Sequence, residues 1–210
     1  MVVQSTALIG VGGIGTALLP GLARLQPERL TLWDDDVVSE DNLINQLFWH
    51  PEDVGTPKVD AAAAWLSRSG LTIETHASRY TGEVFTDTIV IAGVDSMESR
   101  RLIWRGTKRA DSRTKLLLDG RLSRETPFFL QLFAIPLDDP FASEAYEQWL
   151  EGDGELDTGR RDLDMVPAPQ VLSGLISTLV VRWSRGDNLP WQVMWDGVSM
   201  SLASFESERS

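Results

Sequence analysis

The stretch that most constrains the fold is residues 6–25, TALIGVGGIGTALLPGLARL, where a short apolar run leads through glycines into a helical pattern. Residues 6–11 are expected to form a buried strand, after which apolar residues recur at helical spacing. Between the two, Gly10, Gly12 and Gly15 form the motif G-x-G-x-x-G. The first glycine permits the tight turn, the second lets a phosphate approach the backbone, and the third allows close helix–strand packing. The stretch therefore predicts a phosphate-binding loop at the start of a helix.

Strand and helix patterns alternate from this loop through residue 120. Such alternation is typical of an α/β fold, and we expect a doubly wound, Rossmann-like, mostly parallel sheet with helices on both faces. Beyond residue 120 the pattern changes. Residues 127–137 predict an antiparallel strand and residues 191–205 a closing hairpin, so the sheet should gain a C-terminal antiparallel extension.

The region between that strand and the hairpin divides into two parts. Residues 138–164 are acidic and contain glycines, which favours an irregular surface crossover, and residues 167–186 predict a long apolar helix. We expect a single domain over residues 1–210. Its nucleotide-binding half would occupy residues 1–120, and the crossover and sheet extension residues 121–210.

Charge and cysteine content exclude several classes of function. The chain has 19 Lys and Arg against 31 Asp and Glu, a net charge of −12, which disfavours nucleic acid and anionic membranes as partners. The apolar run VLSGLISTLVV is too short to span a bilayer, and no N-terminal signal pattern is seen. With no cysteine, the chain has no disulfide, thiolate zinc site or cysteine nucleophile. We expect a soluble cytoplasmic protein.

Polar residues gather after the predicted strand at residues 29–33. Asp34 ends that strand about 20 residues beyond the glycine loop, where a carboxylate can accept hydrogen bonds from a ribose. Further amide and carboxylate side chains follow at Asp36, Asn42, Asn45 and Gln46. Lys58 then opens an alanine-rich helix, and a lysine beside an anion site can neutralise phosphates. One carboxylate would suffice for an NAD(P)-dependent oxidoreductase, which stays open as an alternative.

Taken together, these segments resemble the ThiF/MoeB/ubiquitin-activating superfamily. The resemblance rests on ALIGVGGIGT, LTLWDDDVVSEDNLINQ, DVGTPK and AGVDSMESR in the same order, and it continues to the end of the chain. Members use ATP and Mg²⁺ to adenylate the C-terminal carboxylate of a ubiquitin-like or sulfur-carrier protein, or sometimes a smaller carboxylate. The resemblance implies that reaction here, with such a small protein as partner. It also implies a homodimer or heterodimer, for which the apolar segments 128–135 and 171–181 are candidate contact surfaces.

The resemblance implies roles for individual residues. Asp34 would hold the ribose hydroxyls, and Asp36 and Asn42 would shape the floor of the site. Lys58 would contact the phosphates, and Asp95 would position Mg²⁺ and the triphosphate.

Two other positions match the family with less definite roles. Gln46 matches a family position in the same segment as Asn42. Arg100 matches a position on the helix after Asp95, with a structural or phosphate-proximal role.

Asn45 departs from the family pattern, because it stands where members carry an arginine that contacts the ATP phosphates. Asparagine cannot supply that bidentate cationic fork, so the transition state would lose a stabilising group. Arg121 or Arg124 could replace the cation, although a structural role for both is equally open. A partner subunit could also supply it. Otherwise the chain would be an inactive scaffold or pseudo-subunit.

The absence of cysteine is a second departure, because many members bind zinc through cysteines and some carry the acyl group as a thioester. The reaction would here end at the acyl-adenylate or pass to an external nucleophile. His50 and His76 show no metal-ligand pattern. The four tryptophans in apolar contexts are expected to pack in the core: Trp33, Trp65, Trp104 and Trp183.

Overall fold

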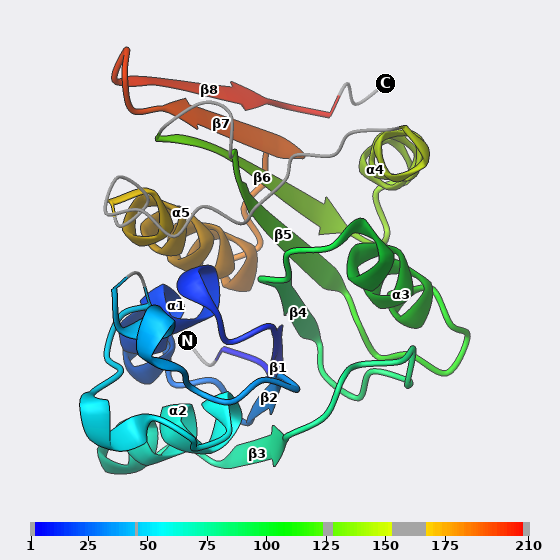
Figure 1. The fold of residues 1–210 in the computed structure, drawn as a ribbon. Coiled ribbons are helices and arrows are strands. Elements are labelled where there is room, and N and C mark those ends of the chain that lie inside the picture. Colours follow the sequence, from blue (N-terminus) through cyan, green and yellow to red (C-terminus); the bar gives the residue numbers. More distant parts are fainter. Residues whose placement is uncertain (1–2, 45, 124–127, 153–166, 208–210) are drawn as a thin grey trace.

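A computed structural model describes residues 3–44, 46–123, 128–152 and 167–207. Within these ranges the chain forms one eight-stranded sheet with helices on both faces (Figure 1). The strand order is β3-β2-β1-β4-β5-β6-β7-β8, in which the first five strands are parallel and the last three antiparallel to their neighbours. This confirms the mostly parallel sheet with a C-terminal antiparallel extension.

The elements of the N-terminal half are β1 (Thr6–Ile9), α1 (Gly13–Leu25), β2 (Leu30–Trp33), α2 (Lys58–Leu66), β3 (Ile73–His76), β4 (Ile89–Ala92) and α3 (Met97–Thr107). Three short 3-10 helices accompany them in the described part of this half: η1 (Glu40–Leu43), η2 (Pro51–Asp53) and η3 (Ser67–Ser69). The C-terminal elements are β5 (Leu116–Leu122), β6 (Phe129–Pro136), α4 (Pro140–Glu151), α5 (Pro167–Ser184), β7 (Gln192–Asp196) and β8 (Ser201–Phe205).

The sheet has a core on each face. On one face, α1, α2 and α5 cover a cluster that contains Leu8 and Leu32; on the other, α3 and α4 cover a cluster that contains Ala7 and Phe133 (Figure 1). Adjacent residues Ala7 and Leu8 enter opposite clusters because side chains alternate across a strand. Strands buried on both faces explain the continuous apolar runs in the sequence.

Helix α4 contradicts the irregular crossover expected for residues 138–164. Asp139 caps the helix by accepting a hydrogen bond from the Ala142 amide at 3.1 Å, and Pro140 occupies its first turn. Ala142, Tyr146 and Leu150 recur every four residues and are buried. These start and spacing signals were present in the sequence, but the acidic composition obscured them. Residues 153–166 of the crossover lie outside the described ranges.

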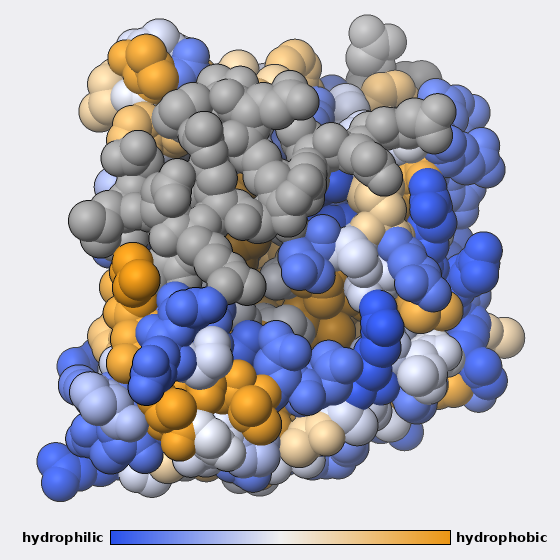
Figure 2. All heavy atoms as spheres, viewed as in Figure 1, coloured by the Kyte–Doolittle hydropathy of each residue, from blue (hydrophilic) through white to orange (hydrophobic). Residues whose placement is uncertain are grey.

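The two apolar segments expected to contact a partner are mostly buried within the chain itself. Strand β6 lies between β5 and β7, and α5 packs against α1, so residues 128–135 and 171–181 leave little apolar surface for a second chain. That interpretation was wrong about location. Exposed apolar side chains occur instead around the β7–β8 turn, the orange corner at the upper left of Figure 2, where Val198 and Met200 are 70% and 78% exposed.

No helix within the described ranges combines the length and apolar content required to cross a bilayer.

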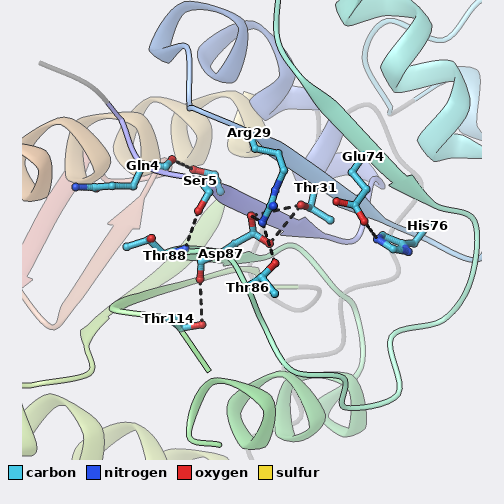
Figure 3. Close-up of polar contacts among 11 residues, drawn as sticks. Gln4, Ser5, Arg29, Thr31, Glu74, His76, Thr86, Asp87, Thr88 and Thr114 are labelled. Carbon is cyan, nitrogen blue, oxygen red and sulfur yellow. Dashed lines mark hydrogen bonds and ion pairs between the residues drawn. The ribbon is translucent and has the colours of Figure 1, made fainter. Parts of the chain in front are cut away.

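A buried polar network joins the amino ends of the parallel strands (Figure 3). Asp87 is 3% exposed, and its carboxylate accepts hydrogen bonds from Arg29 at 2.9 Å and from the Thr31 hydroxyl at 3.3 Å. Arg29 also donates to the Thr86 hydroxyl at 2.8 Å. The Thr114 hydroxyl donates to the Asp87 backbone carbonyl at 3.4 Å. The network ties the segments before β2, β4 and β5 together at the edge of the sheet opposite the cavity described next.

Candidate functional site

A cavity of about 570 Å³ opens at the carboxyl ends of β1, β2 and β4. Figure 2 shows the surface hollowed near its centre, with hydrophilic residues below and to the right of the hollow. The structure brings eight of the predicted site residues into its lining: Gly10, Gly12, Asp34, Asp36, Asn42, Gln46, Lys58 and Asp95. They converge because the carboxyl ends of parallel strands meet at one edge of the sheet.

The three glycines of the loop have different environments. Gly10 has a φ of +93°, which favours glycine, and a Cβ there would lie 2.7 Å from the Gly93 carbonyl oxygen. A Cβ on Gly15 would lie 2.2 Å from the Gly10 carbonyl oxygen, so Gly15 packs beneath the loop and does not line the cavity. A Cβ on Gly12 would meet no atom within 4 Å. Gly12 also starts α1 without a side-chain cap, so the first helix amides are available to a ligand.

Asp34 links the end of β2 to the glycine loop by a hydrogen bond. One carboxylate oxygen accepts a hydrogen bond from the Val11 amide at 2.6 Å, and the other from the Asp36 amide at 2.9 Å. Burial raises the pKa of Asp34, while the Val11 hydrogen bond and the positive charge of Lys58 act in the opposite direction. The carboxylate is thus held in place at the cavity wall.

Lys58 is a buried cation with a fixed position. Its side chain is 6% exposed, and its Nζ donates to Asp36 Oδ2 at 2.6 Å. The Lys58 amide donates to the Asp36 backbone carbonyl at 3.0 Å, which joins the start of α2 to the segment after β2. Because Asp36 is 67% exposed, this ion pair lies at the boundary between the cavity and solvent.

Asp34, Asp35 and Asp36 each place a carboxylate oxygen within 4.8 Å of the others. The Asp34 oxygens accept two backbone amides, and Asp36 is paired with Lys58. Two of the three carboxylates in this acidic cluster, Asp34 and Asp36, are therefore already engaged by the chain's own donors. Asp95 lines a separate part of the cavity, after β4.

The amide side chains between β2 and α2 are also fixed by the chain. Asn42 Oδ1 accepts a hydrogen bond from the Ser39 amide at 3.1 Å and so closes the turn that contains η1. Gln46 Oε1 accepts a hydrogen bond from the indole Nε1 of Trp49 at 3.0 Å. Asn45 lies outside the described residues.

Arg100 lies behind the cavity and supports the loop that carries Asp95. Its guanidinium donates to Asp119 and to the backbone carbonyl of Val94, the residue before Asp95. Burial lowers the pKa of Arg100, as does the nearby charge of Arg121. Of the two roles considered, this geometry supports the structural one.

Arg121, one of the residues considered as a replacement for the family arginine, does not line the cavity. Its guanidinium lies 4.1 Å from the ring centre of Trp149 and donates to the Met97 sulfur at 3.1 Å, away from the lining. Arg124 lies outside the described residues. The cavity instead contains Arg79, which the sequence reasoning missed although it follows a predicted strand; its Nη2 lies 3.9 Å from Glu98 Oε2 and both side chains are exposed.

The prediction that four tryptophans pack in the core is only partly confirmed. Trp104 is buried, whereas Trp65 is 37% exposed and Trp183 is half-buried at the edge of the core. Trp33 lines the cavity, and its ring stacks on His76 with centroids 3.8 Å apart. Trp33 therefore has a position at the candidate site that its apolar context did not indicate.

Comparison with known proteins relates this geometry to a family. A family model described as the ThiF family matches residues 3–193. Over 119 residues the chain is 36% identical to ubiquitin-like modifier-activating enzyme 5 of Drosophila simulans, an alignment covering 48% of this chain and 29% of that protein. Over 102 residues it is 38% identical to the NEDD8-activating enzyme E1 catalytic subunit of Arabidopsis thaliana, covering 46% and 22%. The matches thus span under a third of these relatives' length.

Solved structures show the same fold at low identity. E. coli MccB with ATP is similar with a TM-score of 0.75 and 15% identity, covering 98% of this chain and 64% of that chain. PaaA is similar with a TM-score of 0.71 and 18% identity, covering 97% and 64%.

Proposed function

Because the chain belongs to the ThiF family, we propose that it is an ATP-dependent adenylyltransferase that activates a carboxylate as an acyl-adenylate. The observation that carries this proposal is the cavity in which the open backbone at Gly12, the fixed cation of Lys58 and the carboxylate of Asp95 meet. As substrate we propose the C-terminal carboxylate of a small ubiquitin-like or sulfur-carrier protein. The names of the two curated relatives support the ubiquitin-like class.

The charges of the cavity favour a nucleotide that brings a divalent cation. Its described lining carries four carboxylates and two cations: Asp34, Asp35, Asp36, Asp95, Lys58 and Arg79. A triphosphate adds more negative charge to this field, which a bound cation would offset. Asp95 would hold Mg²⁺, and the ion would neutralise charge on the phosphates. We propose Arg79 as the cation that takes the place of the family arginine at position 45.

In the proposed reaction, a carboxylate oxygen of the partner attacks the α-phosphorus of ATP. The bond from that phosphorus to the bridging oxygen breaks, and pyrophosphate leaves. Lys58 and the uncapped amides of α1 would stabilise the negative charge that develops, while Asp34 would hold the ribose. The work of the protein is positioning and charge stabilisation. Since the chain has no cysteine, the acyl-adenylate would pass to an external nucleophile.

Pyrophosphate exchange into ATP tests the proposal. Purified ubiquitin-like and sulfur-carrier proteins, and free amino acids, serve as carboxylate donors in the presence of Mg²⁺. Exchange that depends on one of these donors is the expected result. Binding of Mg·ATP without exchange for any donor would favour the inactive scaffold. Stabilisation by NAD equal to that by Mg·ATP, measured by thermal unfolding, would favour an oxidoreductase instead.

We further propose that the protein acts in the cytoplasm and as a homodimer or heterodimer. A contact surface would have to lie outside the two buried apolar segments described above. Light scattering separates a homodimer from a heterodimer. It is done at tens of micromolar protein, about 10⁻⁵ M, which is well above the dissociation constant of a stable interface. A strict monomer would count against a homodimer and favour a missing partner.

A further inference from the structure

The segment between η1 and η2 holds Gln46 in one orientation, and we infer that Trp49 is the positioning residue that does so. Trp49 would fix the side-chain amide of Gln46 so that its NH₂ group is presented to the cavity as a donor to a phosphate oxygen. The identity of that ligand rests on the proposed function. The orientation of the amide rests on the structure alone.

The chemistry of the indole ring determines this orientation. The Nε1–H of Trp49 can donate a hydrogen bond but cannot accept one. Only the oxygen of a glutamine amide can accept, so the 3.0 Å contact with Trp49 requires Gln46 Oε1 on that side. The two N–H groups of Gln46 are then left for the cavity that the residue lines. A glutamine without this partner could rotate its amide by half a turn at little cost.

The surrounding turn keeps both side chains in place. Trp49 is 6% exposed and belongs to the core beneath α1 and α2. Phe48 has a φ of +73°, an uncommon conformation for a bulky residue, and its ring lies against Trp65 of α2 with centroids 4.6 Å apart. The backbone N–H of Gln46 donates to the backbone carbonyl of Asn42 at 2.9 Å. The turn is thus fastened to α2, to η1 and to the core.

The side-chain NH₂ of Gln46 is a neutral donor. Gln46 directly follows position 45, where the chain has asparagine. An oriented NH₂ group recognises an anionic oxygen by hydrogen bonding and requires no charge. It would therefore contribute to phosphate binding alongside Lys58, and it would not contribute to recognition of the nucleoside.

Trp49→Phe tests the inference, because it keeps an aromatic ring in the core and removes the donor. We expect the affinity for Mg·ATP, measured by calorimetry, to fall about three- to tenfold, the range for one hydrogen bond. The affinity for adenosine, which has no phosphate, should not change. Trp104→Phe is the matched control: Trp104 is also 6% exposed and donates to Glu147 at 3.1 Å, but outside the cavity.

A second variant separates orientation from packing. In a Gln46→Ala background, Trp49→Phe should cause no further loss of ATP affinity, because the two residues act as a unit. If Trp49→Phe does not fold, Gln46→Glu carries the test, since its carboxylate still accepts from the indole but offers no donor. Unchanged ATP affinity in Trp49→Phe or in Gln46→Glu, or equal losses for ATP and adenosine, would overturn the inference. Failure of the wild type to bind ATP would overturn the proposed function instead.

Discussion

Arg100 and Asp119 form an ion pair in which neither side chain has any exposure to solvent. The second oxygen of Asp119 accepts a hydrogen bond from the Tyr146 hydroxyl at 2.8 Å, and Arg100 also bonds the carbonyl of Val94. A chain of contacts therefore runs from α4 through β5 and α3 to the loop that carries Asp95. The metal-binding role proposed for Asp95 depends on this buried support.

Asp119→Asn should destabilise the fold by about 3 to 5 kcal/mol, because it leaves the Arg100 charge buried without its anion. Chemical denaturation measures this loss. Asp111→Asn is the control, since Asp111 pairs with Arg109 at 3.3 Å on the exposed surface and its loss should not be measurable. Equal effects of the two substitutions would show that the buried pair does not support the fold.

Gly15→Ala should lower the stability of the fold, whereas Gly12→Ala should lower the affinity for Mg·ATP. At Gly15 a Cβ would lie 2.2 Å from a backbone oxygen, so we expect destabilisation of about 1 to 3 kcal/mol from overpacking. At Gly12 a Cβ would meet nothing within 4 Å, so the fold should remain stable while Mg·ATP affinity falls. Melting curves and calorimetry on the two variants check this. Full ATP affinity in Gly12→Ala would place the phosphates elsewhere.

Lys58→Met should lower the affinity for Mg·ATP by about 10- to 100-fold, the loss expected for one charge-assisted hydrogen bond. Lys108→Met is the matched control, because Lys108 lies 4.9 Å from the ring centre of Trp104 and outside the cavity. Calorimetric titration of both variants gives the comparison. Similar affinities for Lys58→Met and the wild type would contradict a phosphate contact at Lys58.

The raised pKa of Asp34 predicts a dependence of stability on pH. A raised value means that the folded chain holds this proton more tightly than the unfolded chain. The resulting stabilisation is complete below the ordinary carboxyl pKa of about 3.9 and is lost as pH rises through the raised value. Relative to Asp34→Asn, the wild type should therefore lose stability over that window. Urea unfolding of both proteins from acidic to neutral pH measures the difference; a constant difference would contradict the prediction.

Arg79→Gln should lower pyrophosphate exchange by about 10²- to 10³-fold if Arg79 supplies the charge that Asn45 does not. Asn45→Arg should then add little to the wild type but should recover part of the loss in the Arg79→Gln background. Arg105→Gln, also on the surface but outside the cavity, is the control. If the wild type binds ATP without exchange and Asn45→Arg creates it, the proposal that this chain is an enzyme is wrong.

Much of the candidate site could be predicted because its residues adjoin strand ends. Asp34 follows β2 and Asp95 follows β4, and the topology of a parallel sheet brings such positions to one edge without knowledge of side-chain directions. The glycine motif then identified which edge. The strands were predictable for the same reason: those buried on both faces are continuous in apolar residues.

The face of the sheet on which the Arg121 side chain lies could not be predicted, because it depends on how side chains alternate along β5. Asp119 and Arg121 face α4, whereas Leu122 turns to the other face and lines the cavity. A shift of one residue in the predicted strand would reverse all of these assignments. The hydrogen bond between Trp49 and Gln46 could not be predicted either, because it requires a turn with a positive φ at Phe48.

From the change from parallel to antiparallel pairing at β5 and β6 we expect a particular order of folding. Pairing β7 with β8 brings Asp196 opposite Ser201, and pairing β5 with β6 brings Leu122 opposite Leu130, so both close short loops. The sheet edge that carries the cavity needs Ile9 opposite Ala92, and closing that longer loop costs more entropy. We therefore expect the candidate cavity to be completed late. A bound nucleotide should slow unfolding, with little effect on the rate of folding.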